Sequence, residues 1–108
     1  MLFRSNGQSS TADATGHLYT GTLFNNPVWV ASTAPLVFNQ ISLDALKFSG
    51  GNDYVQVAHN TNLNAFPFTA TAWFRTTNTS PTGQGIVSKY IDGTRDGWAV
   101  IQIGRAHV

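Results

Sequence analysis

The sequence of 108 residues predicts an all-β fold built from antiparallel strands. Three observations lead to this prediction. Apolar and polar residues alternate in short runs, as at Leu46, Lys47 and Phe48, with the period of two that is typical of half-buried strands. Clusters of Gly, Asn and Asp separate these runs and favour turns. The apolar spacing of a helix is absent, apart from one turn near residues 60–65.

The N-terminal part carries the weaker signals. Residues 6–15 are small and polar, which predicts a linker or a lead-in to a domain. Residues 16–24 form the first weak strand pattern, residues 25–27 a turn, and residues 28–30 a short strand. Pro27 suits a strand start or an edge because it has no N–H to donate. For residues 31–43, both a short strand and a buried loop remain open.

The centre of the chain predicts a β-meander. Residues 45–48 and 54–57 alternate as two strands, and residues 49–53 (SGGND) contain the glycines and turn formers of a tight reversal. In residues 68–75 one face carries Phe and Ala, while the other carries Thr, Trp73 and Arg75. This run predicts the third strand of the meander.

The C-terminal part predicts two further strands. Residues 76–85 read as a polar loop and residues 85–90 as a strand. Residues 91–97 contain two Asp-Gly signals for turns, and residues 98–101 begin the last strand.

Several of these segments, taken in order, resemble one known family. ALKFSG (45–50), NDYVQV (52–57), Leu63, FTATAWFR (68–75) and IVSK (86–89) are similar to the laminin-G-like domains of the concanavalin A-like lectin/glucanase superfamily. DATG (13–16), GTL (21–23) and PVWV (27–30) resemble the opening of such a domain. The resemblance implies an antiparallel sandwich of jelly-roll type, of which residues 16–102 would be the incomplete N-terminal part.

Both ends of the chain resemble translated sequencing adapter. Residues 1–5 match the translation of the adapter string GTG CTC TTC CGA TCT with GTG as the start codon, and residues 103–108 match the translation of ATC GGA AGA GCA CAC GTC. The reverse complement of the first string, AGATCGGAAGAGCAC, contains the beginning of the second. We therefore exclude both segments from fold reasoning, and we expect that trimming them removes nothing the fold needs. We also expect that the remaining insert, lacking later strands, exposes unpartnered apolar faces.

Composition excludes several functions. Without Arg4 and Arg105, four basic residues stand against five aspartates, and no cluster of Lys or Arg marks a nucleic-acid partner. The chain has no cysteine, and no apolar run approaches the roughly 20 residues of a membrane helix. Charged residues make up only 10% of the chain, against about a quarter in most globular proteins, which suits secreted bacterial β-sandwich modules.

The residues for catalysis are missing as well. Glycoside hydrolysis needs a pair of carboxylates across the scissile bond, and this chain has no glutamate and five aspartates, mostly in turn contexts. His17 and His59 are isolated in turn-rich surroundings, without the spacing of a metal or triad site. We therefore expect no enzyme within this chain.

Two weaker candidate sites remain. Asn52 and Asp53 offer the hard oxygen ligands that calcium takes, and members of the resembling superfamily often carry this ion. Backbone capping by Asp53 is the favoured alternative. Trp73 and Tyr54 are candidates for stacking on a sugar ring. The face of Trp73 can also belong to the core between two sheets, which is the interpretation we favour.

The function expected from these observations is a non-catalytic module that binds carbohydrate or another surface ligand. It would belong to a larger secreted or cell-surface bacterial protein, with a glycan or an extracellular protein as its partner. Two alternatives stay open: a structural or adhesive spacer, and an accessory domain of a secreted glycoside hydrolase or other hydrolase.

Overall fold

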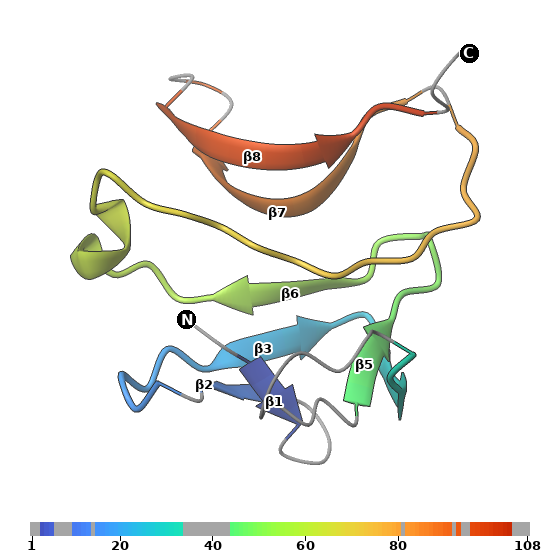
Figure 1. The fold of residues 1–108 in the computed structure, drawn as a ribbon, viewed down its shortest axis with the longest axis horizontal. Helices are drawn as coiled ribbons and strands as arrows, with labels where there is room; N and C mark the ends of the chain where they lie inside the picture. The colour runs from blue at the N-terminus through green and yellow to red at the C-terminus, as the bar shows by residue number, and fades with distance from the viewer. Residues whose placement is uncertain are drawn as a thin grey trace. The chain divides into compact units, whose positions relative to one another are not determined.

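The computed structural model describes residues 3–5, 10–13, 15–33, 44–80, 82–91, 93 and 96–104, and of residues 3–5, 91 and 96 only the backbone. The chain divides into two compact units, Met1–Phe68 and Thr69–Val108. Among the described residues every regular element is a strand except one 3₁₀ turn, η1 (Thr61–Asn64) (Figure 1). The all-β prediction and the single turn near residues 60–65 are both confirmed. No helix in this part of the chain has the length and apolarity needed to cross a membrane.

The first unit contains two antiparallel sheets. The larger has the strand order β1-β2-β3-β6, made of β1 (Phe3–Ser5), β2 (Ser10–Asp13), β3 (Gly21–Phe24) and β6 (Tyr54–Val57). The smaller pairs β4 (Val28–Ala31) with β5 (Asp44–Lys47). Of the strand expected over residues 16–24, only residues 21–24 form a strand, and residues 16–20 do not. The strand expected at residues 28–30 is present, with Pro27 directly before β4.

The two sheets are joined by a bent hairpin. β3 pairs with β6 in the register Phe24↔Tyr54, and β4 pairs with β5 in the register Val28↔Lys47. Both chain segments therefore leave one sheet and enter the other together, at residues 25–27 and at residues 48–53. We term these two stretches the corner. Bends at which strands switch sheets are the usual way for β-proteins to turn from one sheet to the next.

The residues of the corner explain why the chain bends there. Asn25 and Asn26 have φ of 60° and 66°, a left-handed conformation that Asn tolerates better than most residues, and Gly50 has φ of 85°. Across the corner, Asn25 Nδ2 donates to the carbonyl oxygen of Asn52 at 2.8 Å. Turn chemistry on both segments and one side-chain hydrogen bond between them thus fix the bend.

The second unit is organised by one hairpin. β7 (Gln84–Ile91) pairs with β8 (Asp96–Gln102), with an irregular register between Gly85 and Val87. Gly97, with φ of 116°, faces Tyr90 across the pair. The strands predicted at residues 85–90 and 98–101 are confirmed, and each extends beyond the predicted ends.

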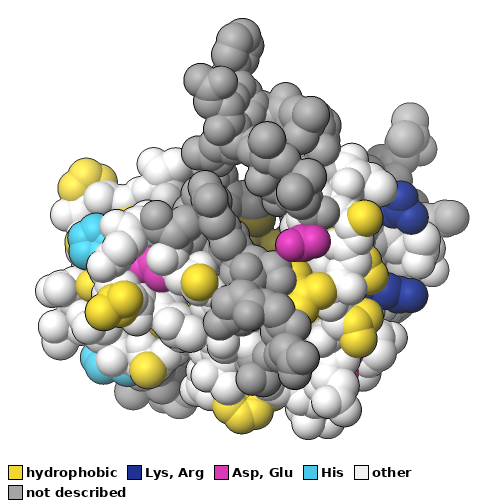
Figure 2. All heavy atoms as spheres, turned by 90° about the horizontal axis from the view of Figure 1, so that it is seen from below, with side chains coloured by type: hydrophobic (Ala, Val, Ile, Leu, Met, Phe, Trp, Pro, Cys, Tyr) yellow, Lys and Arg dark blue, Asp and Glu magenta, His cyan; other side chains and the backbone are white. Residues whose placement is uncertain are grey.

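Burial is slight in both units. No hydrophobic residue is fully buried in the described part of the chain, and the one buried polar side chain is Thr11, at 1% exposure. Figure 2 accordingly shows hydrophobic side chains at the surface in several separate places.

The prediction of a β-meander in the centre of the chain is wrong. β5 and β6 lie at the predicted places, but they pair with β4 and β3 and not with each other. The SGGND segment is one half of the corner, so it carries the chain from one sheet to the other instead of reversing it within a sheet. Alternation along a strand selects a face but not a partner, which is why this error arose.

The strand predicted at residues 68–75 is also absent. The segment is extended but belongs to no sheet, and every side chain in it is exposed. Trp73 is 70% exposed, so the expectation that it lies in the core is wrong as well. Alternation stabilises a strand only where a neighbour supplies ladder hydrogen bonds and a second layer covers the apolar face. Neither is supplied to these residues by the described part of the second unit.

Two segments set aside from the fold do contain strands. Residues 10–13, within the expected linker, form β2 and pair with β3, and residues 3–5 form β1 and pair with β2. Pairing has prevailed over a local sequence that lacks apolar alternation. The adapter origin of residues 1–5 stays a prediction, and so does the expectation that trimming them removes nothing the fold needs, although residues 3–5 pair with β2. Residues 34–43, left open between strand and loop, lie outside the described residues.

Candidate functional site

The candidate site begins with a loop organised by Asp13 at the end of β2. Asp13 Oδ1 accepts hydrogen bonds from the backbone N–H of Thr15 at 2.9 Å and from its hydroxyl at 2.6 Å. Asp13 Oδ2 accepts a third from the backbone N–H of Tyr19 at 3.3 Å. This is the short-range capping that Asp favours after a strand. One carboxylate thus holds both ends of the loop.

Within the loop, the backbone places two rings side by side. Gly16 and Leu18 have φ of 83° and 60°, and the Thr20 N–H donates to the carbonyl oxygen of Leu18 at 2.9 Å, which closes a three-residue turn. The rings of His17 and Tyr19 are parallel within 4°, with centroids 5.8 Å apart. Rings in direct contact lie about 3.5–4 Å apart, so this spacing requires a lateral offset. Part of each ring face is therefore uncovered.

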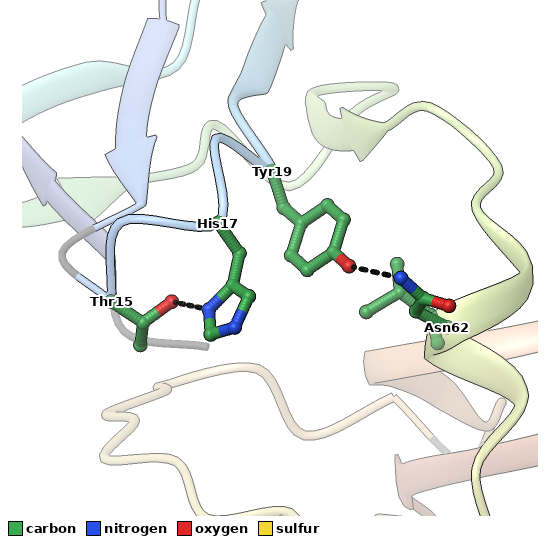
Figure 3. A pocket seen from close by; sticks show the side chains of 5 residues that line it. Thr15, His17, Tyr19 and Asn62 are labelled. Atoms are coloured by element: carbon green, nitrogen blue, oxygen red, sulfur yellow. Dashed lines mark hydrogen bonds between the residues drawn. The ribbon is translucent and has the colours of Figure 1, made fainter.

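A second segment completes the site. Asn60 caps η1 by accepting from Asn62 N–H at 2.9 Å, and Asn62 Nδ2 donates to Tyr19 Oη at 3.3 Å. Figure 3 shows Asn62 and Tyr19 pointing toward each other, with His17 beside Tyr19 and Thr15 on the other side of His17, its hydroxyl toward the ring. An open hollow of about 290 Å³ lies between them, lined by Thr15, His17, Tyr19, Asn62 and Leu63.

The chemistry of the hollow is that of binding. It offers one aromatic face, an imidazole, a phenol, an amide, a hydroxyl and one aliphatic side chain. Its volume is near the lower limit of the roughly 300–1,000 Å³ of small-molecule sites, which suits a ligand of about one ring. The Thr15 hydroxyl lies 2.9 Å from His17 Nδ1, but it donates its proton to Asp13 Oδ1 and not to the imidazole, so the arrangement favours recognition over reaction.

Hydrogen bonds stabilise the ionised carboxylate of Asp13, which lies next to the lining residue Thr15. The hydroxyl of Thr15 and then its backbone N–H hold the pKa of Asp13 below its ordinary value of 3.8. Desolvation opposes them, and the N–H of Tyr19 lowers the pKa by a smaller amount. Since the folded pKa is lowered, the loop gains stability from the ionised carboxylate above pH 3.8. That gain is lost as the pH falls through the folded pKa.

The lowered pKa of Asp13 predicts how the loop responds to acid. The amide resonances of Thr15 and Tyr19 should titrate together with a midpoint below 3.8, because both amides donate to Asp13. Asp13→Asn keeps an acceptor oxygen and removes the charge, so it should abolish this titration. A midpoint above 3.8 in the unsubstituted chain would contradict the proposed role of Asp13.

No protein family, curated protein or solved structure matches this chain. The resemblance to laminin-G-like domains therefore stays a prediction, and the site has to be judged by its own geometry.

The residues predicted for calcium lie at the corner, away from these lining residues in sequence. Asp53 Oδ2 accepts from the Ser49 N–H at 2.7 Å, and the carbonyl oxygen of Asn52 accepts from Asn25. Backbone capping by Asp53, the favoured alternative, is confirmed. In the described part of the chain no three His, Cys, Asp or Glu residues come together. Calcium takes six to eight oxygen ligands, and a single capping carboxylate does not fit it.

We therefore expect calcium to leave stability unchanged. The midpoint of thermal unfolding should be the same with calcium and with a chelator, because a ligand stabilises only a state that binds it. Asp53→Ala should lower the midpoint equally in both conditions, because the lost hydrogen bond reduces the free energy of unfolding by about 1 kcal/mol. A rise with calcium that Asp53→Ala removes would contradict this prediction.

The two aromatic candidates are exposed but lie outside the hollow. Tyr54 is 46% exposed and stacks on Phe24, its cross-strand partner, with centroids 4.8 Å apart and planes within 9°. Trp73 lies in the extended segment of the second unit. Neither has the group of convergent polar side chains found beside Tyr19.

Sequence reasoning missed the hollow. His17 was expected to be isolated in turn-rich surroundings. It does lie in an exposed bend, but the hydroxyl of Thr15 and the ring of Tyr19 lie beside it. The signal available in the sequence was Asp13, with Thr15 two residues later and Gly16 after it, a pattern that favours a side-chain-closed turn. Nothing local pointed to Asn62, which is 43 residues from Tyr19.

Proposed function

We propose that this chain contributes a non-catalytic carbohydrate-binding module to a secreted or cell-surface bacterial protein. The observation that carries the proposal is the open hollow at Tyr19, in which a partly uncovered aromatic pair meets an amide and a hydroxyl. A sugar ring has an apolar face that stacks on an aromatic side chain and a rim of hydroxyls that bond to amides and hydroxyls. The hollow combines both kinds of group on the scale of one ring.

The finer fold assignment belongs to the same proposal. We infer that the strands are part of an antiparallel sandwich of jelly-roll type, similar to laminin-G-like domains. The ordered sequence segments support this inference, as does the corner, because sandwiches need strands that pass from one sheet to the other. A glycan is the proposed partner, and no step of catalysis is assigned to the chain.

Substitution of Tyr19 tests the function. The probe is an array of immobilised oligosaccharides with neutral, N-acetylated, uronic-acid and sulfated members, followed by calorimetry with the best binder. Tyr19→Ala should weaken binding about two- to tenfold, because stacking contributes about 0.5–1.5 kcal/mol and each 1.4 kcal/mol is a factor of ten. Tyr90→Ala removes an exposed tyrosine of β7 and should leave binding unchanged.

Two results would overturn the proposal. One is that the unsubstituted chain binds no member of the array. The other is that Trp73→Ala abolishes binding while Tyr19→Ala has no effect, which would move the site to the exposed tryptophan predicted from sequence.

A further inference from the structure

We infer that the hollow selects neutral, hydroxyl-rich sugars and rejects uronic-acid or sulfated ones, because His17 is held as a hydrogen-bond acceptor by Thr15 and Asp13. The inference rests on the proposed function and specifies its ligand class. It follows from which atoms carry the hydrogen-bonding protons in the row of side chains Asp13, Thr15 and His17.

The row begins at the carboxylate. An ionised Asp13 can only accept, and the Thr15 hydroxyl, 2.6 Å from Oδ1, donates its single proton there. Thr15 Oγ1 also lies 2.9 Å from His17 Nδ1. Because its single proton is already donated to Asp13, the hydroxyl can only accept from His17. The proton of the neutral imidazole is therefore on Nδ1.

This assignment fixes what His17 offers to a ligand. A neutral ring protonated at Nδ1 has a lone pair at Nε2, on the edge of the ring that Thr15 does not occupy. His17 is exposed and lines the hollow. A sugar hydroxyl can donate to Nε2. A carboxylate or sulfate oxygen has no proton to donate, so its lone pair would repel that of Nε2.

Charge acts in the same direction. None of the five lining residues is Lys or Arg, the side chains that usually bind carboxylates and sulfates. Asp13 places a negative charge one hydrogen bond behind Thr15. At Tyr19, the phenol oxygen accepts from Asn62 and keeps its own proton for donation. Hydroxyl groups, which both donate and accept, match this set of atoms.

The tautomer of His17 can be measured directly. Long-range ¹H–¹⁵N spectra of the intact chain at about pH 8, where histidines are neutral, should show the Nδ1-protonated form at His17. Thr15→Val keeps the side-chain shape and the backbone hydrogen bond to Asp13 but removes the hydroxyl. It should release His17 to the Nε2-protonated form and leave the spectrum of His59 unchanged.

Binding to the oligosaccharide array gives the second readout. The unsubstituted chain should bind neutral members at least tenfold more tightly than uronic-acid or sulfated members of equal length. Thr15→Val should weaken neutral binding about three- to tenfold. Thr22→Val, the same change at an exposed threonine of β3, should have no effect.

The outcomes separate the two proposals. Preference for anionic members overturns this inference and leaves the carbohydrate-binding function standing. Failure to bind any member overturns the function itself. An Nε2-protonated His17 in the unsubstituted chain overturns the inference whatever the array shows.

Discussion

Replacing Gly97 by alanine is expected to disrupt the β7–β8 hairpin. A Cβ at this position would overlap the carbonyl oxygen of Lys89 and lie 2.8 Å from its carbonyl carbon and 2.9 Å from Tyr90 Cα. All three are backbone atoms of the paired strand, so no side-chain rotation relieves the overlap. Gly97 also has φ of 116°, where side chains are strained. Overpacking and strain each cost about 1–3 kcal/mol, so we expect a loss of about 3 kcal/mol or more.

Hydrogen exchange measures this effect locally. Amide protection across β7 and β8 should collapse in Gly97→Ala. Gly85→Ala is the matched control, because a Cβ on Gly85 of the same hairpin meets nothing within 4 Å and its backbone is not in the left-handed region. Equal protection in the two variants would show that the hairpin does not need a glycine at position 97.

Replacing Thr11 by valine is expected to stabilise the first unit. Thr11 is 1% exposed in the second strand of the larger sheet, and its Oγ1 is buried with no hydrogen-bond partner among the described residues. A buried hydroxyl without a partner costs about 1–3 kcal/mol. Valine has nearly the same shape and replaces that hydroxyl by a methyl group, so the free energy of unfolding should rise by about 1–2 kcal/mol.

Denaturant titration of Thr11→Val and of a control, Thr22→Val, shows whether the gain in stability comes from the buried hydroxyl or from the higher strand propensity of valine. Thr22→Val makes the same exchange on the neighbouring strand β3, where the side chain is exposed, so it should change stability by less than about 0.5 kcal/mol. A destabilised Thr11→Val would reveal a partner for the hydroxyl and would contradict the prediction.

Sequence predicted the strands better than their partners. β3, β4, β7 and β8 were found because alternation and turn formers act within a few residues. The partner of β6 was missed because the alternating pattern of Val55 and Val57 fits any neighbouring strand equally well. The polar strand β2 was missed because its structure depends on pairing with strands on both sides.

In the candidate sites, too, contacts between residues close in sequence were predicted, and contacts between distant residues were missed. Capping by Asp53 was foreseen because its donor, Ser49, lies only four residues away. The bond from Asn62 to Tyr19 joins two loops whose meeting depends on the whole of the first unit. Residue type alone could not bring those two side chains together.

The corner has a consequence for the order in which the first unit folds. Pairing β4 with β5 closes a loop of the 12 residues between Ala31 and Asp44, whereas pairing β3 with β6 first would close the 29 residues between Phe24 and Tyr54. The longer closure costs about 0.8 kcal/mol more in chain entropy. We expect the smaller sheet to form in the transition state and the larger one to follow by zippering through the corner. Substitutions in β4 or β5 should then slow folding, while those in β3 or β6 should mainly speed unfolding.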